Sequence, residues 1–566
     1  MTNVPRTPRV VGRQRREKDE VVAQHGVAAT KHPIASQRAI DTLEAGGNAV
    51  DAAVVAALCI GTLIPQASGI GGGGYLVFHD AASGETRFVD YANESPAAAD
   101  PERYPPHPEG GFGSTQGWRR VKDDANFRGW RSMCVPGQVA GLAYALERWG
   151  TITWAAALQP AIELAEEGVP FALEVQQQVI ADWTHLAEQP PALETFTQDG
   201  RPYRVGEKVR YPRLARTLRR LSEAGPEDFY VGQIARDVAA DMAERGGEIT
   251  YGDWSHFEAR SELPPLELRY RDVTLRAPRS SCGSITALQT LALLEGFDLA
   301  GRDAHGADAL HLWDVATRIA FADRHMFVGD GIDVPWEGLL SREYAVERRR
   351  LIRMDSLPER LEAGDPWAYE PRPRPAVRYE RSHPWEEHGT QHVSVVDKDR
   401  NLVALTDTLV GWACVVLPRT GIVMNNAMTW HDPLPGRAAS LRPHSRGLNN
   451  MSPTILLRDG QPLGAIGARG GRHITGTVAR AISLVVDHGF AIQAAAGAPQ
   501  IDSSHPHTRV DSRIAADVRQ ELERRGHTVE VAEGGRAGAG AGGVLVAGSE
   551  VRGGEDPTGD SAAVGY

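Results

Sequence analysis

The chain has 566 residues, of which 42% are hydrophobic and 24% charged, a balance typical of a globular protein with a sizeable core. Its formal net charge of −12 offers no basic surface to a phosphate backbone, so we expect no nucleic-acid partner. The longest apolar run, residues 52–64, is too short to span a bilayer, so we expect no membrane partner.

The first residues and the cysteines indicate the compartment. Residues 1–25 begin with a polar, arginine-rich stretch that has no apolar run behind it, which predicts a disordered leader and not a secretory signal. The four cysteines are far apart and match no metal-binding or redox spacing, so we expect no disulfide framework and no cofactor. The simplest location for such a chain is the cytoplasm.

Glycine and proline divide the front of the chain into short elements. Residues 33–45 are predicted as a helix that begins at Pro33, and residues 49–62 as a second, apolar helix capped by Asn48. A glycine run at 68–74 leads into a strand at 75–78, which pairs with 87–91. Such a run lets backbone approach backbone or a ligand. It precedes a strand and lacks the Gly-Lys-Ser/Thr ending, so it does not indicate a phosphate loop.

The middle of the chain is mostly helical. Helices are predicted between residues 136 and 247, then at 286–296 and 307–327, with one strand at 273–276. Residues 355–384 are rich in proline and charge, which predicts an exposed connector.

After residue 389 strands come first and helices later. Strands are predicted at 393–396, 402–406 and 422–424, and a hairpin joins 454–457 to 462–466 around Asp459-Gly460. Helices follow at 475–488 and 514–525, and the Gly/Ala-rich residues 534–543 are expected to be flexible. This order suits a layered sandwich.

Gly389 and Thr390 stand immediately before the first of these strands. A threonine hydroxyl is a poor nucleophile unless a base lies beside it. If the Gly389–Thr390 bond were cut, the new α-amine, with a reference pKa of roughly 8, would be that base. The same residues also fit an ordinary loop that enters an edge strand.

Further motifs occur in a fixed order along the chain. They are His32-Pro33 and residues 46–53, 68–74, 135–141, 390–397, 401–408, 421–426, 450–454 and 467–471. Together they resemble the γ-glutamyltranspeptidase family of self-cleaving N-terminal-nucleophile hydrolases, over nearly the whole chain from residue 26. The resemblance implies an α+β fold, a four-layer αββα sandwich. A large segment, 26–389, and a small segment, 390–566, would form it jointly and stay paired.

The resemblance also assigns roles to single residues. It implies that Thr390 is the nucleophile, first in self-cleavage after Gly389 and then toward the substrate. Thr408 matches the threonine that hydrogen-bonds the nucleophile. Gly470 and Gly471 match the pair whose N–H groups form the oxyanion hole. Without the resemblance, Thr408 is an ordinary strand residue and the glycines form a turn.

The positions that hold a γ-glutamyl head group in the family depart from its pattern. Apolar or neutral residues replace an arginine, an asparagine, a glutamine, an aspartate and a serine pair. An amino-acid zwitterion would lose its charged partners there. We therefore expect a small-molecule acyl amide with a glutaryl- or oxalyl-like group, transferred to water, with the tryptophan filling the space of the amino group. The positions are Ala92, Val410, Ala427, Trp430, Asn449 and Asn450.

Three alternative functions and the role of one arginine pair remain open at this point. One is carbon–carbon bond hydrolysis of the kind attributed to relatives in alkylproline antibiotic pathways, and another is ordinary glutathione hydrolysis or γ-glutamyl transfer. Arg469 and Arg472 could form a replacement anion clamp or be surface charges. A metal-dependent hydrolase could use the cluster His383, Glu386, Glu387, His388 and His392, although its spacing matches no helical His-Glu-x-x-His site.

Overall fold

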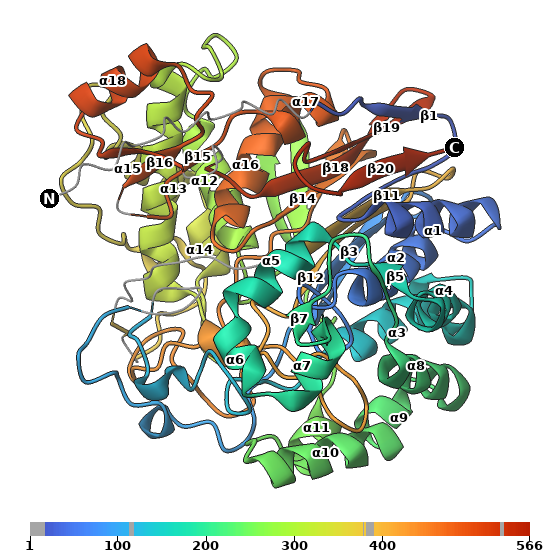
Figure 1. Cartoon of the computed structure of the whole chain (residues 1–566). Helices are drawn as coiled ribbons and strands as arrows, with labels where there is room; N and C mark the ends of the chain where they lie inside the picture. The colour runs from blue at the N-terminus through green and yellow to red at the C-terminus, as the bar shows by residue number, and fades with distance from the viewer. Residues whose placement is uncertain (1–16, 113–117, 377–378, 381–389, 506, 533–536) are drawn as a thin grey trace, which may run out of the picture.

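The computed structural model describes residues 17–112, 118–376, 379–380, 390–505, 507–532 and 537–566. Two sheets lie face to face, with a layer of helices outside each sheet (Figure 1). The predicted αββα sandwich is therefore confirmed. Among the described residues, no helix has both the length and the apolar character needed to cross a membrane.

Each sheet contains strands from both sides of residue 390. Sheet A has the order β1 (Val21–Ala23), β19 (Glu550–Glu555), β18 (Gly540–Ala547), β14 (Gln461–Arg469), β13 (Thr454–Arg458), β10 (Val273–Ala277), β9 (Leu266–Tyr270). Sheet B has the order β20 (Ala562–Gly565), β2 (Val27–Thr30), β11 (Gln391–Val396), β12 (Leu402–Thr408), β3 (Gly73–Asp80), β4 (Glu85–Tyr91). Neighbouring strands are antiparallel in both sheets. Neither sheet is complete without both segments.

Helices cover the outer faces. The layer on sheet B includes α1 (Pro33–Glu44), α2 (Ala49–Leu63), α3 (Gln138–Trp149) and α4 (Trp154–Glu167). The layer on sheet A includes α12 (Ser284–Leu294), α13 (Ala307–Phe327), α16 (His473–Val486) and α17 (Ile492–Gly497). The remaining helices are α5 (Leu173–Ala181), α6 (Trp183–Ala187), α7 (Pro190–Phe196), α8 (Pro212–Ala224), α9 (Glu227–Tyr230), α10 (Gln233–Arg245), α11 (Tyr251–His256), α14 (Trp336–Leu340), α15 (Arg342–Arg349) and α18 (Ala516–Arg524). Short strands outside the two sheets are β5 (Val169–Pro170), β6 (Thr197–Gln198), β7 (Arg201–Pro202), β8 (Lys208–Val209), β15 (Ile501–Asp502), β16 (Thr508–Val510) and β17 (Val529–Val531).

Separate apolar clusters fill the spaces between the layers. Val77 and Leu402 of sheet B meet Ile455 and Val544 of sheet A between the sheets. A second cluster lies between sheet B and its helices, and a third between sheet A and its helices. The strand faces that bury these side chains fix the register of the sheets, since a slip by one residue would turn every side chain to the other face.

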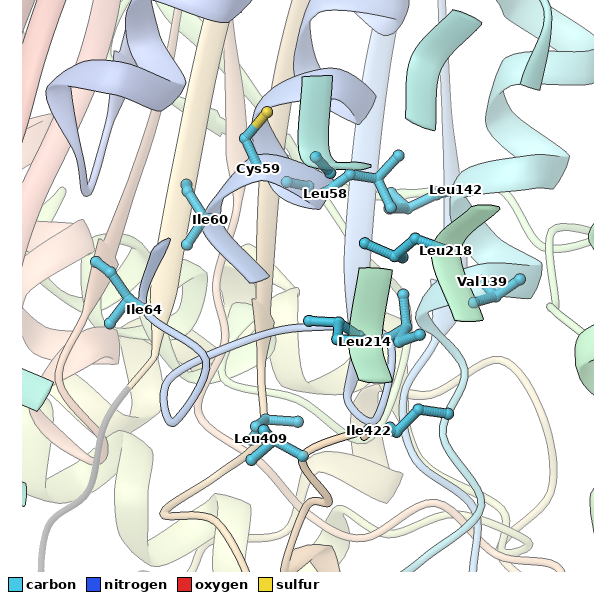
Figure 2. Close-up of a cluster of buried hydrophobic side chains, with 14 of the residues drawn as sticks. Leu58, Cys59, Ile60, Ile64, Val139, Leu142, Leu214, Leu218, Leu409 and Ile422 are labelled. Atoms are coloured by element: carbon cyan, nitrogen blue, oxygen red, sulfur yellow. The ribbon is translucent and has the colours of Figure 1, made fainter. Parts of the chain in front are cut away.

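The cluster on sheet B joins the two segments directly. Figure 2 shows Leu409 and Ile422, which follow residue 390, among side chains that precede it. The labelled partners from the front of the chain are Leu58, Cys59, Ile60, Ile64, Val139, Leu142, Leu214 and Leu218. Burying an aliphatic side chain of this size is worth roughly 1.5–3 kcal/mol. The two segments therefore share one core.

The predicted hairpin is confirmed, and the strand at 422–424 is wrong. Asp459 and Gly460 both have positive φ, 50° and 77°, as the two-residue turn between β13 and β14 requires. Residues 422–424 make only an isolated bridge, Val416 with Val423, beside the loops of the site. Directly after this bridge, Asn425 donates its side-chain N–H groups to Gly71 O at 2.7 Å and Cys134 O at 2.9 Å, so this segment is bonded to loops and not to a sheet.

The Gly/Ala-rich residues are partly a strand. Positions 533–536 lie outside the described residues, but β18 begins at Gly540 in the middle of sheet A. A Cβ on Gly542 would lie 2.0 Å from Glu555 Oε1, so the absent side chain permits close packing. For residues 540–543 the expected flexibility is therefore wrong.

The ends of the described fold meet at one edge. Positions 1–16 of the predicted leader lie outside the described residues. Within 17–25, Val21–Ala23 form β1 and pair with β19, which corrects the expected disorder there. Tyr566 donates its N–H to Gly26 O at 3.1 Å and accepts the His25 N–H at 2.9 Å. The last residue is thus bonded to the residues that follow β1.

Candidate active site

Thr390 lies immediately before β11, at the edge of a strand as predicted, and its side chain faces sheet A. Along this strand Ser394 donates to Ala465 O at 3.2 Å, and a Cβ on Gly467 would lie 2.2 Å from His392 Cε1. Ser394 therefore faces Ala465, and His392, two residues earlier on β11, faces Gly467, two residues later on β14. The next step brings Thr390 to Arg469 and Gly470.

These three residues line one cavity of about 930 Å³. Its wall mixes charges of both signs with small and apolar groups, from both segments and from the turn before α16. Lys31 there pairs with Glu174 at 2.8 Å. The described lining residues are Lys31, Leu173, Glu174, Gln177, Gln178, Val205, Thr390, Arg469, Gly470, His473, Arg509, Gly538, Ala539, Gly540, Asp556, Thr558, Gly559, Asp560 and Ser561. A space of this volume accommodates a drug-sized substrate.

Thr408 stands opposite Thr390. Gln391 pairs with Asp407, so one step further along the antiparallel register sets Thr390 beside Thr408. The hydroxyl oxygen of Thr408 accepts the N–H of Val410 at 2.7 Å, which fixes its rotamer. Two threonine side chains thus share the inner face of sheet B at the edge of the cavity.

Gly470 and Gly471 join β14 to α16. Their φ angles are 130° and 59°, in the region that favours glycine, so the turn depends on these residue types. The helix that follows begins at His473 and directs the positive end of its dipole toward the same turn. Backbone N–H groups before a helix N-terminus suit a developing negative charge.

The glycine run places a second set of groups around the site. A Cβ on Gly72 would lie 2.4 Å from Thr408 O, so the run packs backbone against the strand of Thr408. Ser68, at the start of the run, donates to Asp407 Oδ1 at 2.6 Å. Gln138 donates to Asp407 Oδ2 at 2.7 Å, and Gln391 also donates to this carboxylate. Burial raises the pKa of Asp407 to about 6, although these hydrogen bonds oppose the rise.

The sequence did not single out Asp407, although it lies between the strand residues Thr406 and Thr408. No local signal marks it, because its partners are 16 to 339 positions away along the chain. Only the strand pairing brings these groups together.

The positions that depart from the family come together in a separate apolar cluster. Ala92, Val410, Ala427 and Trp430 are all buried in it, with Met428 and Met451 among their neighbours. None of these residues is among the described residues that line the cavity of Thr390.

Asn449 and Asn450 lie at the border of this cluster and are polar contacts of a buried arginine. Asn449 donates to the Tyr75 hydroxyl at 2.8 Å. Arg324 donates to Asn450 Oδ1 at 3.0 Å and to Asn449 O. Burial lowers the pKa of Arg324 to about 9. The asparagine pair thus holds a cation in the protein interior.

The two arginines beside the glycine pair are not surface charges. Arg469 lines the cavity and donates to Glu555 Oε2 at 2.9 Å and Asp556 Oδ2 at 3.4 Å. Arg472 is buried, donates to Ser504 O and is absent from the described cavity lining. Arg469 reaches the cavity already paired with carboxylates, so the two residues do not form a clamp.

The proposed metal cluster falls largely outside the described residues. Positions 381–389, which include His383, Glu386, Glu387, His388 and Gly389, lie outside the described residues. His392 contacts Thr406 Oγ1 and Ser394 Oγ, each at 2.8 Å, through its two ring nitrogens. Burial lowers its pKa to about 3. This imidazole is therefore a neutral part of the hydrogen-bonded sheet interior.

Comparisons with known proteins agree over nearly the whole chain. The family model described as Gamma-glutamyltranspeptidase matches residues 35–566. The glutathione hydrolase proenzyme of Bacillus subtilis (strain 168) is 31% identical over 512 residues, 89% of this chain and 85% of that protein. The acylase ACY 1 proenzyme of Pseudomonas sp. (strain V22) is 32% identical over 522 residues, 91% and 88% of the two chains. The crystal structure of cephalosporin acylase from Bacillus halodurans matches with a TM-score of 0.84 at 26% identity, covering 100% of this chain and 99% of that one.

Proposed function

The chain belongs to the gamma-glutamyltranspeptidase family, and from that premise we propose that it cuts itself before Thr390 and then hydrolyses a small acyl amide through the Thr390 hydroxyl. The observation that carries this proposal is the shared cavity of Thr390 and Gly470, with Thr408 opposite the nucleophile in the strand register. Relatives named as proenzymes support the processing step.

Self-cleavage would begin at the Thr390 hydroxyl. Its oxygen attacks the carbonyl carbon of Gly389, the peptide bond breaks, and the peptide nitrogen becomes the α-amine of Thr390. Water then hydrolyses the resulting ester and leaves a carboxylate on Gly389. The products are two segments that end at Gly389 and begin at Thr390.

Substrate turnover would use the same oxygen with the new amine as base. The amine accepts the hydroxyl proton while the oxygen attacks the acyl carbonyl. N–H groups at Gly470 and Gly471 would hold the oxyanion, and such a donor is worth roughly 3–4 kcal/mol in acyl transfer. The proton then goes to the leaving amine, and water hydrolyses the acyl ester.

The acyl group is proposed to be glutaryl- or oxalyl-like. Ala92, Val410 and Trp430 pack into an apolar cluster where the family places charged or carboxamide groups. If the acyl group extends past the described lining of the cavity into this cluster, a free α-amino acid head group would be desolvated there without ionic partners, which costs several kcal/mol. The similarity to proteins named as acylases supports a substrate other than glutathione.

Ordinary glutathione hydrolysis is the second candidate. Several relatives carry that name, and the cavity wall offers both Lys31 and Arg509 as cations and Glu174 and Asp560 as anions. The zwitterionic head group of a γ-glutamyl substrate could pair with these charged side chains if it binds in the cavity beside Thr390.

The first experiment examines the chain itself. Mass spectrometry of purified protein should find two segments, and N-terminal sequencing of the smaller one should begin Thr-Gln-His-Val. Thr390→Ala should remain one chain and be inactive, with Thr420→Ala as a matched control that is still cut. If active wild-type protein consisted of a single intact chain, Thr390 could not be its N-terminal nucleophile.

The second experiment separates the two substrate classes. Matched γ-glutamyl, glutaryl and oxalyl anilides are compared by kcat/KM on processed protein. We expect the glutaryl or the oxalyl anilide to have the highest kcat/KM. If the γ-glutamyl anilide leads by tenfold, about 1.4 kcal/mol in transition-state binding, the argument from Trp430 fails and glutathione hydrolysis replaces it.

A further inference from the structure

A cluster of metal-type donors lies behind one wall of the cavity, outside the machinery described above. His473 is the first residue of α16, Asp502 belongs to β15, and His505 follows that strand. All three are buried. His473 also lines the cavity that holds Thr390, whereas Asp502 and His505 are not among its described lining residues, so the cluster meets the cavity at His473.

The donor atoms of these residues converge. Asp502 Oδ2 lies 3.0 Å from His473 Nδ1 and 3.4 Å from His505 Nε2. One atom from each residue can be chosen so that all lie within 4.8 Å of one another. Zn²⁺ binds imidazole nitrogen and carboxylate oxygen at about 2.0–2.2 Å, so two donors in a tetrahedral site lie about 3.4 Å apart. The observed spacings are close to that value.

We propose that His473, Asp502 and His505 form a binding site for a Zn²⁺-type divalent metal ion in the cavity wall. Two imidazoles and one carboxylate are a donor set that zinc prefers over calcium or magnesium, which take oxygen ligands. Three protein ligands leave a fourth position for a water molecule or another small ligand. The ion itself is not required by the threonine chemistry, so the site is independent of the proposed function.

The surrounding charge determines the fourth ligand. Arg472 lies near enough to interact electrostatically with Asp502, and Arg509 also lines the cavity. A divalent ion beside these cations is stabilised when its remaining ligand is an anion. The fourth ligand is therefore a hydroxide or a carboxylate.

Metal binding is tested on untagged, full-length protein that has been stripped with a chelator and dialysed. Zn²⁺ is titrated calorimetrically, and Co²⁺ is added separately to record the visible bands of four-coordinate cobalt. We expect one equivalent per chain. Asp502→Asn, which keeps the side-chain shape, should weaken binding by about 100-fold or more and abolish the cobalt bands.

Three comparisons complete the experiment. The other described cluster with suitable geometry consists of the buried Glu94, the exposed His256 and the half-buried His444, so His444→Ala is the matched control and should bind zinc like wild type. Thr390→Ala should also bind normally, which separates this site from the nucleophile. The proposal is overturned if wild type binds no stoichiometric zinc, if Asp502→Asn binds equally well, or if His444→Ala alone loses the ion. Thermal unfolding of each variant without metal shows that the fold is retained.

Discussion

At the scale of single residues, Asp407 links the site to pH. Its pKa is raised from 3.8 to about 6 by burial. Between those values the unfolded chain loses its proton while the folded chain retains it, so this group makes the fold less stable as pH rises. Above pH 6 the cost reaches about 3 kcal/mol, from the shift of roughly two units at 1.36 kcal/mol each.

Asp407→Asn should remove this dependence. Well below pH 3.8 the variant and the wild type should differ by a constant amount, because the side chain at this position is then neutral in the folded and the unfolded chain of both proteins. From pH 4 to 7 the wild type should lose stability relative to the variant, because only the wild type carries the buried carboxyl at position 407. Unfolding midpoints measured across this range provide the check. Asp399→Asn, at an exposed carboxylate, is the control and should show no such trend. A parallel pair of curves for Asp407→Asn would contradict the argument.

The sequence predicted where Thr390 lies in the fold but not which buried polar residues surround the cavity. Thr390 could be found because a glycine and an alternating strand mark its place. Asp502 and His473 carry no such mark, since a helix start and a distant strand bring them together. The burial of Arg472 could not be predicted from the sequence either, because a charged residue is expected to be exposed.

At the scale of the elements, glycines hold β3 and the preceding run close to β12. Gly72→Ala would place a Cβ 2.4 Å from Thr408 O, a backbone atom that cannot turn aside. We expect a loss of stability of roughly 1–3 kcal/mol or more, with impaired cleavage because Thr408 shifts. Differential scanning calorimetry and the fraction of cut chain measure both effects.

Gly476→Ala is the matched control within α16. No atom lies within 4 Å of the Cβ it would add, so the substitution should stabilise the helix by about 0.5–1 kcal/mol. If Gly72→Ala and Gly476→Ala changed the stability of the protein equally, the close contact between residue 72 and Thr408 O would be unimportant.

Elements with regular periodicity were predictable, and those set by distant contacts were not. The helix at Ala307–Phe327 agrees with its predicted bounds at both ends, since a long apolar pattern specifies it. Residues 540–543 look flexible in isolation because glycine has no local preference. Their partners Ala465 and Glu555 make them a central strand.

At the scale of the whole molecule, the two segments are parts of one fold. Both sheets combine strands from before and after residue 390, and the apolar cluster in Figure 2 contains side chains from both segments. After cleavage the segments should co-elute in size-exclusion chromatography without denaturant. Residues 390–566 expressed alone should aggregate, because β11 and β12 would lose β2 and β3. Recovery of the small segment as a folded monomer would refute this interdependence.

The layered architecture was predictable from the resemblance and from the order of strands and helices. The pairing order was not, because hydrogen bonds between β2 and β11 join residues hundreds of positions apart. Sequence patterns report which face of a strand is buried but not which strand covers its edge.

The bond between Tyr566 and Gly26 makes a rearranged gene feasible. A flexible linker could join the last residue to the start of β1, so that translation begins with methionine followed by Thr390. Removal of that methionine by an aminopeptidase would expose the threonine amine without any internal cut. Such a circular permutant should be active from the moment it folds, and Thr408→Val in this form would report on turnover separately from maturation.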